Sequence, residues 1–160
     1  MSRTKSIPFF LFDTYMAMIR NSVGTTMFRN AYYNVNGKKE DILRDGDLSC
    51  AVYVSSLLSL LKLLPEVHAT VRGTVNDMRN AGWRRITRPR KGCVIVWGEK
   101  TLKKSGEAHP HIGFYIGDQK AVSNSSKKRA PAVHHWTYGK KGSASHRTIE
   151  AMYWHNQLSH

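Results

Sequence analysis

The chain has 160 residues, of which 41% are hydrophobic, and this is enough apolar material for one domain with a buried core. It carries 25 Lys and Arg against 11 Asp and Glu, and the resulting net charge of +14 should attract polyanions: nucleic acid, an anionic membrane surface or acidic cell-wall polymers. Its two cysteines, Cys50 and Cys93, exclude a disulfide framework and a four-cysteine zinc site, and no apolar run approaches the roughly 18 residues of a membrane span.

The N-terminal segment and the domain organisation can be predicted in outline. The chain starts with basic residues and an apolar run, as a signal peptide does, but Asp13 and Arg20 interrupt the run and no small-residue cleavage site follows. We therefore expect mature sequence synthesised in a reducing compartment, which leaves the final localisation and any release to the cell wall open. We expect residues 1–160 to form a single monomeric domain, in which 1–48 is a helical N-terminal extension.

Helical spacing of apolar residues dominates the first half of the chain. One of the predicted helices is the strongest, because its apolar side chains nearly encircle it, as in a buried central helix. Asp47 or Ser49 can cap the start of this helix, and Pro65 should end it. In chain order, the predictions are a helix or a broken pair of helices over 12–33, a polar loop over 34–47, the central helix over 49–64 and another helix over 70–81.

The second half of the chain changes to the patterns of β-strands. The segment 93–97 (CVIVW) is a continuous, mostly β-branched run, which is typical of a core strand. Further strands are predicted over 111–117, 121–125 and 148–154, separated by polar or glycine-rich loops. Helices followed by a strand meander favour an α+β fold, with the helices packed on an antiparallel sheet of about five strands.

Cys50 is the first candidate for chemistry, because it opens the central helix. The positive end of the helix dipole and the unpaired N–H groups there favour thiolate and should lower the pKa of Cys50. The backbone N–H of Cys50 could also stabilise an oxyanion. The alternative is a small apolar residue packed in the core, which is the usual role of an isolated cysteine.

His111 is the second candidate, because cysteine catalysis needs a histidine within hydrogen-bond reach of the thiol. It begins the strand HIGFYIG, and Gly113 in that strand leaves room where a side chain would crowd the neighbouring helix. A strand that starts against the N-terminus of the central helix would bring the imidazole and the thiol together. The alternative is a half-exposed residue at the end of a strand.

The helix opening at Cys50, the segment 90–97 (RKGCVIVW) and the segment 111–117 (HIGFYIG) together resemble the NlpC-type cysteine peptidases of the papain-like superfamily, which also holds the CHAP amidases. The resemblance covers about half of the chain, from Ser49 to Ser125. It implies a papain-like fold and cleavage of amide bonds, commonly in peptidoglycan stem peptides, with no metal or organic cofactor. Cys93 lies within a strand and is expected to be structural.

The sequence departs from the family at several positions. The family usually has Asp-Cys-Ser at the nucleophile, whereas this chain has Ser-Cys-Ala, and the Pro-Gly-Asp element before the strand is Lys-Gly-Cys here. The family's third residue orients the imidazole from the next strand, and ungapped counting places Ser123 there. A two-residue turn after Gly117 would instead pair Gly113 with Asn124, whose amide can accept from the ring, so Asn124 is favoured. Tyr33 is a candidate for the oxyanion tyrosine that many members carry.

Two other classes of function remain open from the residues alone. Four histidines, at 109, 111, 134 and 135, could hold a metal ion, although no cysteine or carboxylate stands at ligand spacing. Nucleic acid could bind basic residues interleaved with Trp83 and Trp136, namely Arg84, Arg85, Arg88, Arg90, Lys91, Lys127, Lys128 and Arg129. The prediction is a cysteine amide hydrolase with Cys50 as nucleophile and His111 as base. The alternative is a basic, non-catalytic binding module of the same fold that engages an anionic polymer.

Overall fold

The computed structural model describes residues 6–101 and 106–159. The expectation of an α+β fold is confirmed, because helices and antiparallel sheets make up the described residues. In chain order the elements are α1 (Leu11–Asn21), β1 (Tyr32–Val35), β2 (Lys38–Asp41), α2 (Cys50–Leu60), α3 (Val71–Asn80), β3 (Arg84–Ile86), β4 (Val94–Thr101), β5 (Ala108–Gly117), β6 (Lys120–Ser125), β7 (Ala130–His135), β8 (Ile149–Trp154) and the 3-10 helix η1 (Asn156–Ser159).

The main sheet has six antiparallel strands in the order β3-β8-β4-β5-β6-β7, against about five expected and four located in the sequence. The two edge strands, β3 and β7, are the ones that the sequence analysis misses. Each is short or carries a proline or basic residues, so neither shows the apolar run of the inner strands. The predicted inner strands 93–97, 111–117 and 121–125 correspond to β4, β5 and β6.

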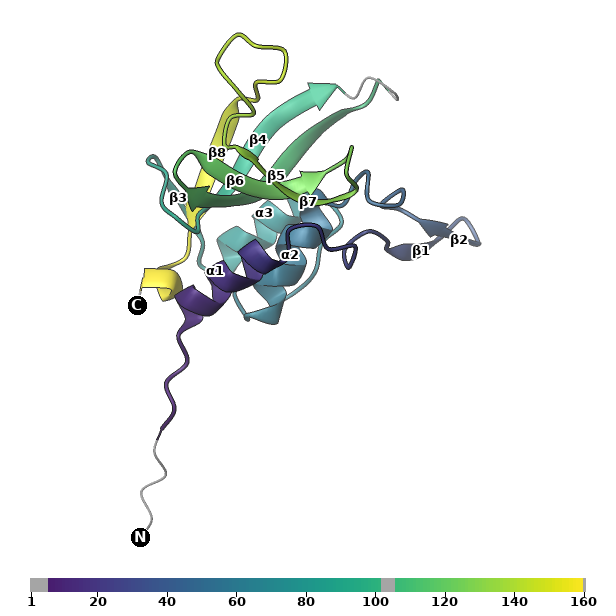
Figure 1. Ribbon diagram of the computed structural model, residues 1–160. Coiled ribbons are helices and arrows are strands. Elements are labelled where there is room, and N and C mark those ends of the chain that lie inside the picture. The colour runs from purple at the N-terminus through teal and green to yellow at the C-terminus, as the bar shows by residue number, and fades with distance from the viewer. Residues whose placement is uncertain (1–5, 102–105, 160) are drawn as a thin grey trace.

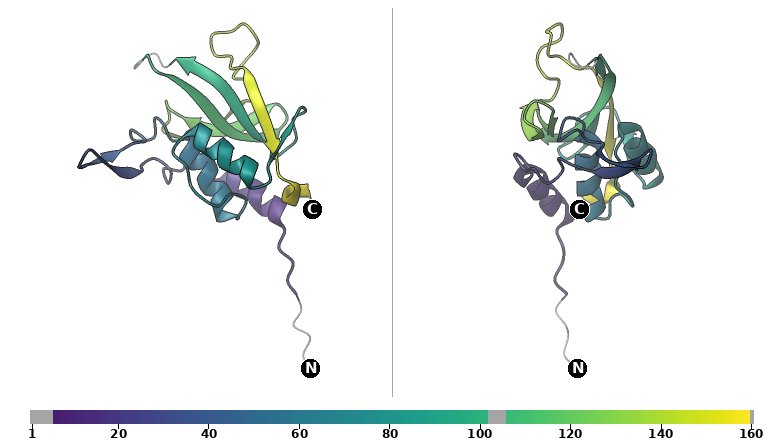
Figure 2. Two further views of the ribbon diagram at one scale, coloured as in Figure 1. Left: turned by 180° about the vertical axis from the view of Figure 1, so that it is seen from behind. Right: turned by 90° about the vertical axis from the view of Figure 1, so that its right-hand side faces the viewer.

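Aromatic side chains join the helices to the sheet. Tyr15 of α1 and Tyr53 of α2 both pack edge-on against Phe114 of β5, with ring centroids 5.7 and 5.6 Å apart. The Tyr15 hydroxyl also donates a hydrogen bond to the carbonyl of Gly92, 2.8 Å away, at the start of β4. The two helices therefore cover the same face of the sheet, and the views in Figures 1 and 2 show the helices together beneath it.

The N-terminal part of the chain is less helical than expected. The predicted helix ends at Asn21, and the hairpin of β1 and β2 occupies the last two positions of the predicted helical region and the first part of the predicted loop 34–47. Its turn is Asn36-Gly37, and both residues have positive φ angles, 51° and 83°, as the tight turn of a twisted hairpin requires. The hairpin extends away from the rest of the molecule (Figure 1).

The central helix α2 begins at Cys50, as the sequence predicts, but it ends before Pro65. Its last helical residue is Leu60, and Lys62 takes a positive φ of 58°. The N–H of Leu63 then bonds to the carbonyl of Leu58 over 2.9 Å, which closes the helix end without the proline. Within 6–101 and 106–159, no helix combines the length and the apolar character that crossing a bilayer requires.

Candidate active site

A cavity of about 1000 Å³ lies where the N-terminus of α2 meets strands β5, β6 and β7, and its volume suits a ligand site. Two of the predicted residues, Cys50 and His111, both line it. The two residues are 61 positions apart in the sequence; Cys50 is the first residue of α2, and His111 lies in β5. Ser123, His134, Tyr138 and Arg147 line the same cavity, so most of its polar wall comes from the second half of the chain.

The Cys50 thiol lies against β5. The backbone N–H of Ile112, the residue after His111, hydrogen-bonds to the sulfur, and Cys50 keeps part of its surface exposed. The prediction of a lowered pKa is wrong: burial raises the pKa of Cys50 and outweighs the backbone N–H groups and the Arg147 charge that act to lower it. The resting side chain is therefore the neutral thiol, and a reaction that needs the thiolate would need a base to remove its proton.

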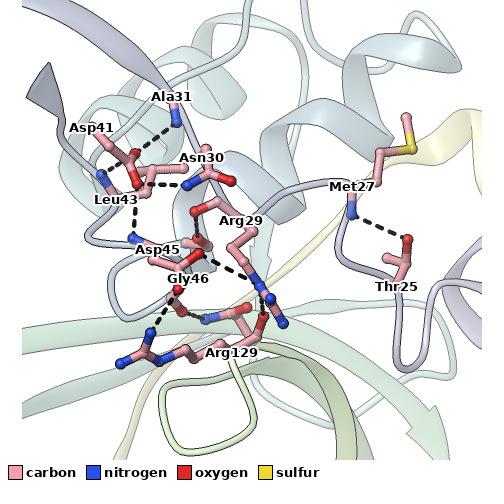
Figure 3. Close-up of polar contacts among 12 residues, drawn as sticks. Thr25, Met27, Arg29, Asn30, Ala31, Asp41, Leu43, Asp45, Gly46 and Arg129 are labelled. Atoms are coloured by element: carbon pink, nitrogen blue, oxygen red, sulfur yellow. Dashed lines mark hydrogen bonds and ion pairs between the residues drawn. The ribbon is translucent and has the colours of Figure 1, made fainter. Parts of the chain in front are cut away.

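The segment before Cys50 is held by the carboxylate of Asp41, at the end of β2. This carboxylate accepts hydrogen bonds from the backbone N–H groups of Ala31, Leu43 and Asp45 and from the Asn30 amide, over 2.7–3.1 Å (Figure 3). Burial acts to raise the pKa of Asp41, but these hydrogen bonds outweigh it and lower the pKa. The loop between β2 and α2 is thus fixed by one side chain.

The same loop is tied to the turn between β6 and β7. Arg129 in that turn pairs with Asp45 over 2.6 Å, and its carbonyl accepts from Nε of Arg29 (Figure 3). Gly46 passes close by, since a Cβ there would stand 2.8 Å from Cβ of Arg129, and its φ of +91° also favours glycine. These contacts hold the start of α2, and hence Cys50, against the strands that carry the other cavity residues.

Replacing Asp41 by Ala is expected to lower the free energy of unfolding by about 2–3 kcal/mol, because four donors lose their acceptor. Glu40→Ala is the matched control: it removes a neighbouring, exposed carboxylate of the same hairpin and should cost less than about 0.5 kcal/mol. Urea unfolding measures both. Equal effects of the two substitutions would contradict the role given to Asp41.

His111 belongs to a hydrogen-bonded network centred on the buried hydroxyl of Ser123. Its Nε2 lies 2.9 Å from Oγ of Ser123, which also lies 2.7 Å from Nε2 of His134 and 2.8 Å from the Tyr138 hydroxyl. Nδ1 of His134 is 2.8 Å from the carbonyl of His135. These four contacts come from β5, β6, β7 and the segment that follows β7.

The network fixes the positions of the protons. A carbonyl only accepts, so Nδ1 of His134 carries a proton, and in the neutral ring its Nε2 must accept from the Ser123 hydroxyl. Ser123 has then used its only proton, and therefore accepts from Nε2–H of His111 and from the Tyr138 hydroxyl. His111 is left with an unprotonated Nδ1, the nitrogen that can take up a proton.

The structure places Asn124 differently from the prediction. Gly117 pairs with Lys120 as expected, but a bulge between Tyr115 and Gly117 shifts the register, so that Gly113 pairs with Ser123. Because neighbouring residues of a strand face opposite sides, Asn124 points away from His111, and its amide donates to the carbonyl of Gly46 over 2.8 Å. The expectation that Asn124 shares the face of His111 is therefore wrong, and Ser123 is the residue that contacts the imidazole.

Tyr33 does not lie where the prediction puts it. It belongs to β1 in the projecting hairpin, pairs with Glu40 and keeps 52% of its surface exposed. It is not among the residues that line the cavity. The tyrosine that does line the cavity is Tyr138, whose ring stacks on the His134 ring with centroids 3.9 Å apart.

Aromatic rings complete the wall around His111. The Trp97 ring lies 5.5 Å from the rings of His111, His134 and Tyr138, and its indole N–H donates to the carbonyl of Trp136 over 2.7 Å. No role for Trp97 or Tyr138 is predicted from the sequence, and His134 is predicted only as a possible metal ligand. The signal available for His134 is a histidine in a segment of strand character, but β7 itself is not predicted.

Burial keeps the two histidines neutral. Burial lowers the pKa of His111 to about 3, and the charges of Arg147 and His134 act in the same direction. Burial also lowers the pKa of His134. As the pH falls below about 6.5, the unfolded chain binds protons that the folded chain does not, so stability falls between pH 6.5 and the lowered pKa.

His111→Gln should therefore reduce the loss of stability on the acid side. Between pH 7 and pH 4.5 the free energy of unfolding of the variant is expected to fall by about 2–3 kcal/mol less than that of the wild type, because one depressed histidine is gone. Urea unfolding at the two pH values gives the difference. Parallel acid losses in both proteins would contradict a depressed pKa of His111.

The predicted metal site is not assembled in the described part of the chain, and one predicted nucleic-acid contact, Trp83, is not available at the surface. Within 6–101 and 106–159, no group of three or more His, Cys, Asp or Glu side chains could hold a metal ion. His109 pairs with Glu107 instead, over 3.2 Å. Trp83, expected to stack on bases in a nucleic-acid site, is buried and donates its indole N–H to the carbonyl of Leu63.

Cys93 differs sharply from Cys50. It is fully buried immediately before β4 rather than within the predicted strand, and burial raises its pKa to about 11. It therefore serves as an internal standard for the reactivity of a packed thiol. No protein-family model matches the chain, and no curated protein matches it.

Proposed function

We propose that the protein is a cysteine hydrolase that cleaves an amide bond in peptidoglycan stem peptides, with Cys50 as nucleophile and His111 as base. The observation that carries the proposal is the single cavity lined by the Cys50 thiol and by an imidazole whose Nε2–H is fixed on Ser123. A thiol, a neutral base with one free nitrogen and a group that orients the base are the parts that nucleophilic catalysis needs.

The reaction follows from the protonation states. Nδ1 of His111 takes the thiol proton while Sγ of Cys50 attacks the amide carbonyl, and backbone N–H groups at the start of α2 stabilise the oxyanion. The C–N bond then breaks, His111 returns the proton to the leaving amine and a thioester remains on Cys50. Water attacks the thioester with His111 as base, which releases the carboxylic acid and restores the thiol.

The resemblance to the NlpC-type peptidases supports the choice of bond. A buried helix that starts at the cysteine and a following antiparallel strand that carries the histidine near its start agree with that family's arrangement. Ser123 stands where the family has its orienting residue by ungapped counting. A hydroxyl alone is a weak orienter, but here Ser123 is itself held by His134 and Tyr138.

Ser123→Ala is expected to lower kcat/KM about 10- to 100-fold, because Nε2–H of His111 loses its acceptor. The ¹⁵N shifts of the His111 ring give a readout that simple loss of stability would not move. They should report the Nε2–H tautomer in the wild type and a mixture of tautomers in the variant. Asn124→Ala, one residue along β6, should leave the tautomer unchanged, and a change in this control would contradict the assignment.

Digestion of purified peptidoglycan peptides, followed by mass spectrometry of the products, tests the proposed function. The wild type and Cys93→Ala should release fragments that gain one water at an amide bond, and Cys50→Ala should release none. Fragments that persist in Cys50→Ala would overturn the nucleophile. If no fragment forms but the protein sediments with peptidoglycan or with DNA, the chain is a basic binding module instead, in line with its net charge of +14.

A further inference from the structure

Arg147 is a cation of the cavity that the proposed reaction does not use. It lies in the segment before β8 and lines the cavity together with Cys50 and His111. Its Nη2 donates to the carbonyl of His109 over 3.2 Å, and its guanidinium lies 5.9 Å from the Tyr138 ring. Its charge reaches the reacting groups, since it acts to lower the pKa of both Cys50 and His111.

The described residues provide no counterion for this guanidinium. Among residues 6–101 and 106–159, no carboxylate forms an ion pair with Arg147, and its buried Nε has no hydrogen-bond partner. A buried donor without a hydrogen-bond partner costs free energy, and a partly buried charge without a counterion adds to that cost. The fold therefore keeps a donor and a positive charge in the cavity wall at a cost to its stability.

The other charged residues that line the cavity also carry a net positive charge. Four other lysine and arginine side chains line it, namely those of Arg72, Lys100, Lys127 and Lys128, against the two carboxylates of Asp47 and Glu99. An anion that enters the cavity is thus attracted before it reaches Arg147. A carboxylate matches the fork of a guanidinium and can accept two hydrogen bonds from it.

We propose that Arg147 binds a carboxylate of the substrate beside the scissile bond, so that the enzyme prefers acyl substrates with an acidic group close to the amide it cleaves. This inference rests on the proposed function, because it takes Cys50 as the reacting group. The bound carboxylate would accept from the Arg147 guanidinium and supply the counterion that the described residues lack.

Alkylation of Cys50 by two reagents of nearly equal size tests this without a known substrate. Iodoacetate carries a carboxylate and iodoacetamide does not, and the ratio of their rates cancels the effect of the thiol pKa. Arg147→Gln is expected to lower the iodoacetate-to-iodoacetamide ratio at Cys50 on the order of 10-fold, the size of one nearby charge in a partly screened site. Arg147→Lys keeps the charge but not the forked guanidinium, so its iodoacetate-to-iodoacetamide ratio should lie between those of the wild type and Arg147→Gln.

Arg88→Gln is the matched control, because it removes one positive charge from a residue that does not line the cavity, and its ratio should stay within about two-fold of the wild type. An Arg147→Gln ratio equal to that of the control would overturn the carboxylate site and leave Arg147 with its structural bond to His109. If Cys50 reacts with both reagents no faster than buried Cys93, the proposed function fails. The two failures are therefore distinguishable.

Discussion

Cys50→Ala and His111→Ala are each expected to lower kcat/KM by about 10⁴-fold or more, and the double variant no further. The reason is the protonation state at rest. Burial raises the pKa of the Cys50 thiol and lowers that of His111 to about 3, so the pair rests as thiol and neutral imidazole. The nucleophile then exists only while His111 takes its proton, and removing either partner removes the same step.

Kinetics on a peptide that the wild type cleaves measure the three variants. His135→Ala is a suitable control, since His135 lies near the site on β7 but its ring contacts Gln119 and Thr137 rather than the Ser123 network. Additive losses in the double variant would mean that thiol and imidazole act in separate steps. A His111→Ala variant with nearly full activity would mean that another residue is the base. The contacts of His111 through Ser123 would then have no role in catalysis.

The pair of catalytic candidates could be located from the sequence because each belongs to a strongly apolar element, although β5 begins three residues before His111 rather than at it. Cys50 opens a helix whose apolar side chains nearly surround it, and His111 lies in a strand with glycines that let neighbours approach closely. Burial forces such a helix and strand to pack on each other. The cavity that both residues line follows from this packing, whereas their catalytic roles stay predictions.

The orienting residue could not be fixed from the sequence, because it depends on strand register. A single extra residue, in the bulge between Tyr115 and Gly117, decides whether Ser123 or Asn124 faces His111. No apolar alternation distinguishes the two, since both side chains are buried in β6. The positions of His134 and Arg147 depend on an edge strand and on a long loop, where the pattern of apolar residues carries no signal.

The pKa of Cys50 is raised where a lowered pKa was predicted, and the physical cause applies to many helix starts. A helix N-terminus favours thiolate by a modest amount, whereas removing the charge from water costs much more. The sequence shows the helix start but not how deeply the packed strands cover it. Burial therefore reverses the expected direction of the pKa shift here, and the proposed reaction depends on the neutral His111 to take the thiol proton.

Gly113→Ala is expected to destabilise the fold by about 1–3 kcal/mol or more and to remove most of the activity. A Cβ at this position would stand 2.6 Å from Cβ of Ser123 and 2.6 Å from the carbonyl of Val122, closer than side-chain carbons approach. The crowding comes from the paired strand β6 and from Trp97, rather than from the helix that the sequence analysis expects. Relieving it has to move backbone, because Val122 contributes a carbonyl.

Gly98→Ala in the adjacent strand β4 separates this clash from the general effect of losing a glycine. A Cβ there would meet only the carbonyl of Thr148, at an ordinary distance of 3.8 Å, so stability and activity should change little. Because Ser123 holds Nε2 of His111, the Gly113 variant should also show mixed tautomers of His111 by ¹⁵N NMR under conditions where it is still folded. A folded Gly113→Ala variant with the wild-type tautomer and activity would mean that β5 and β6 can separate without disturbing the imidazole, and that the close pairing at Gly113 is not what holds it.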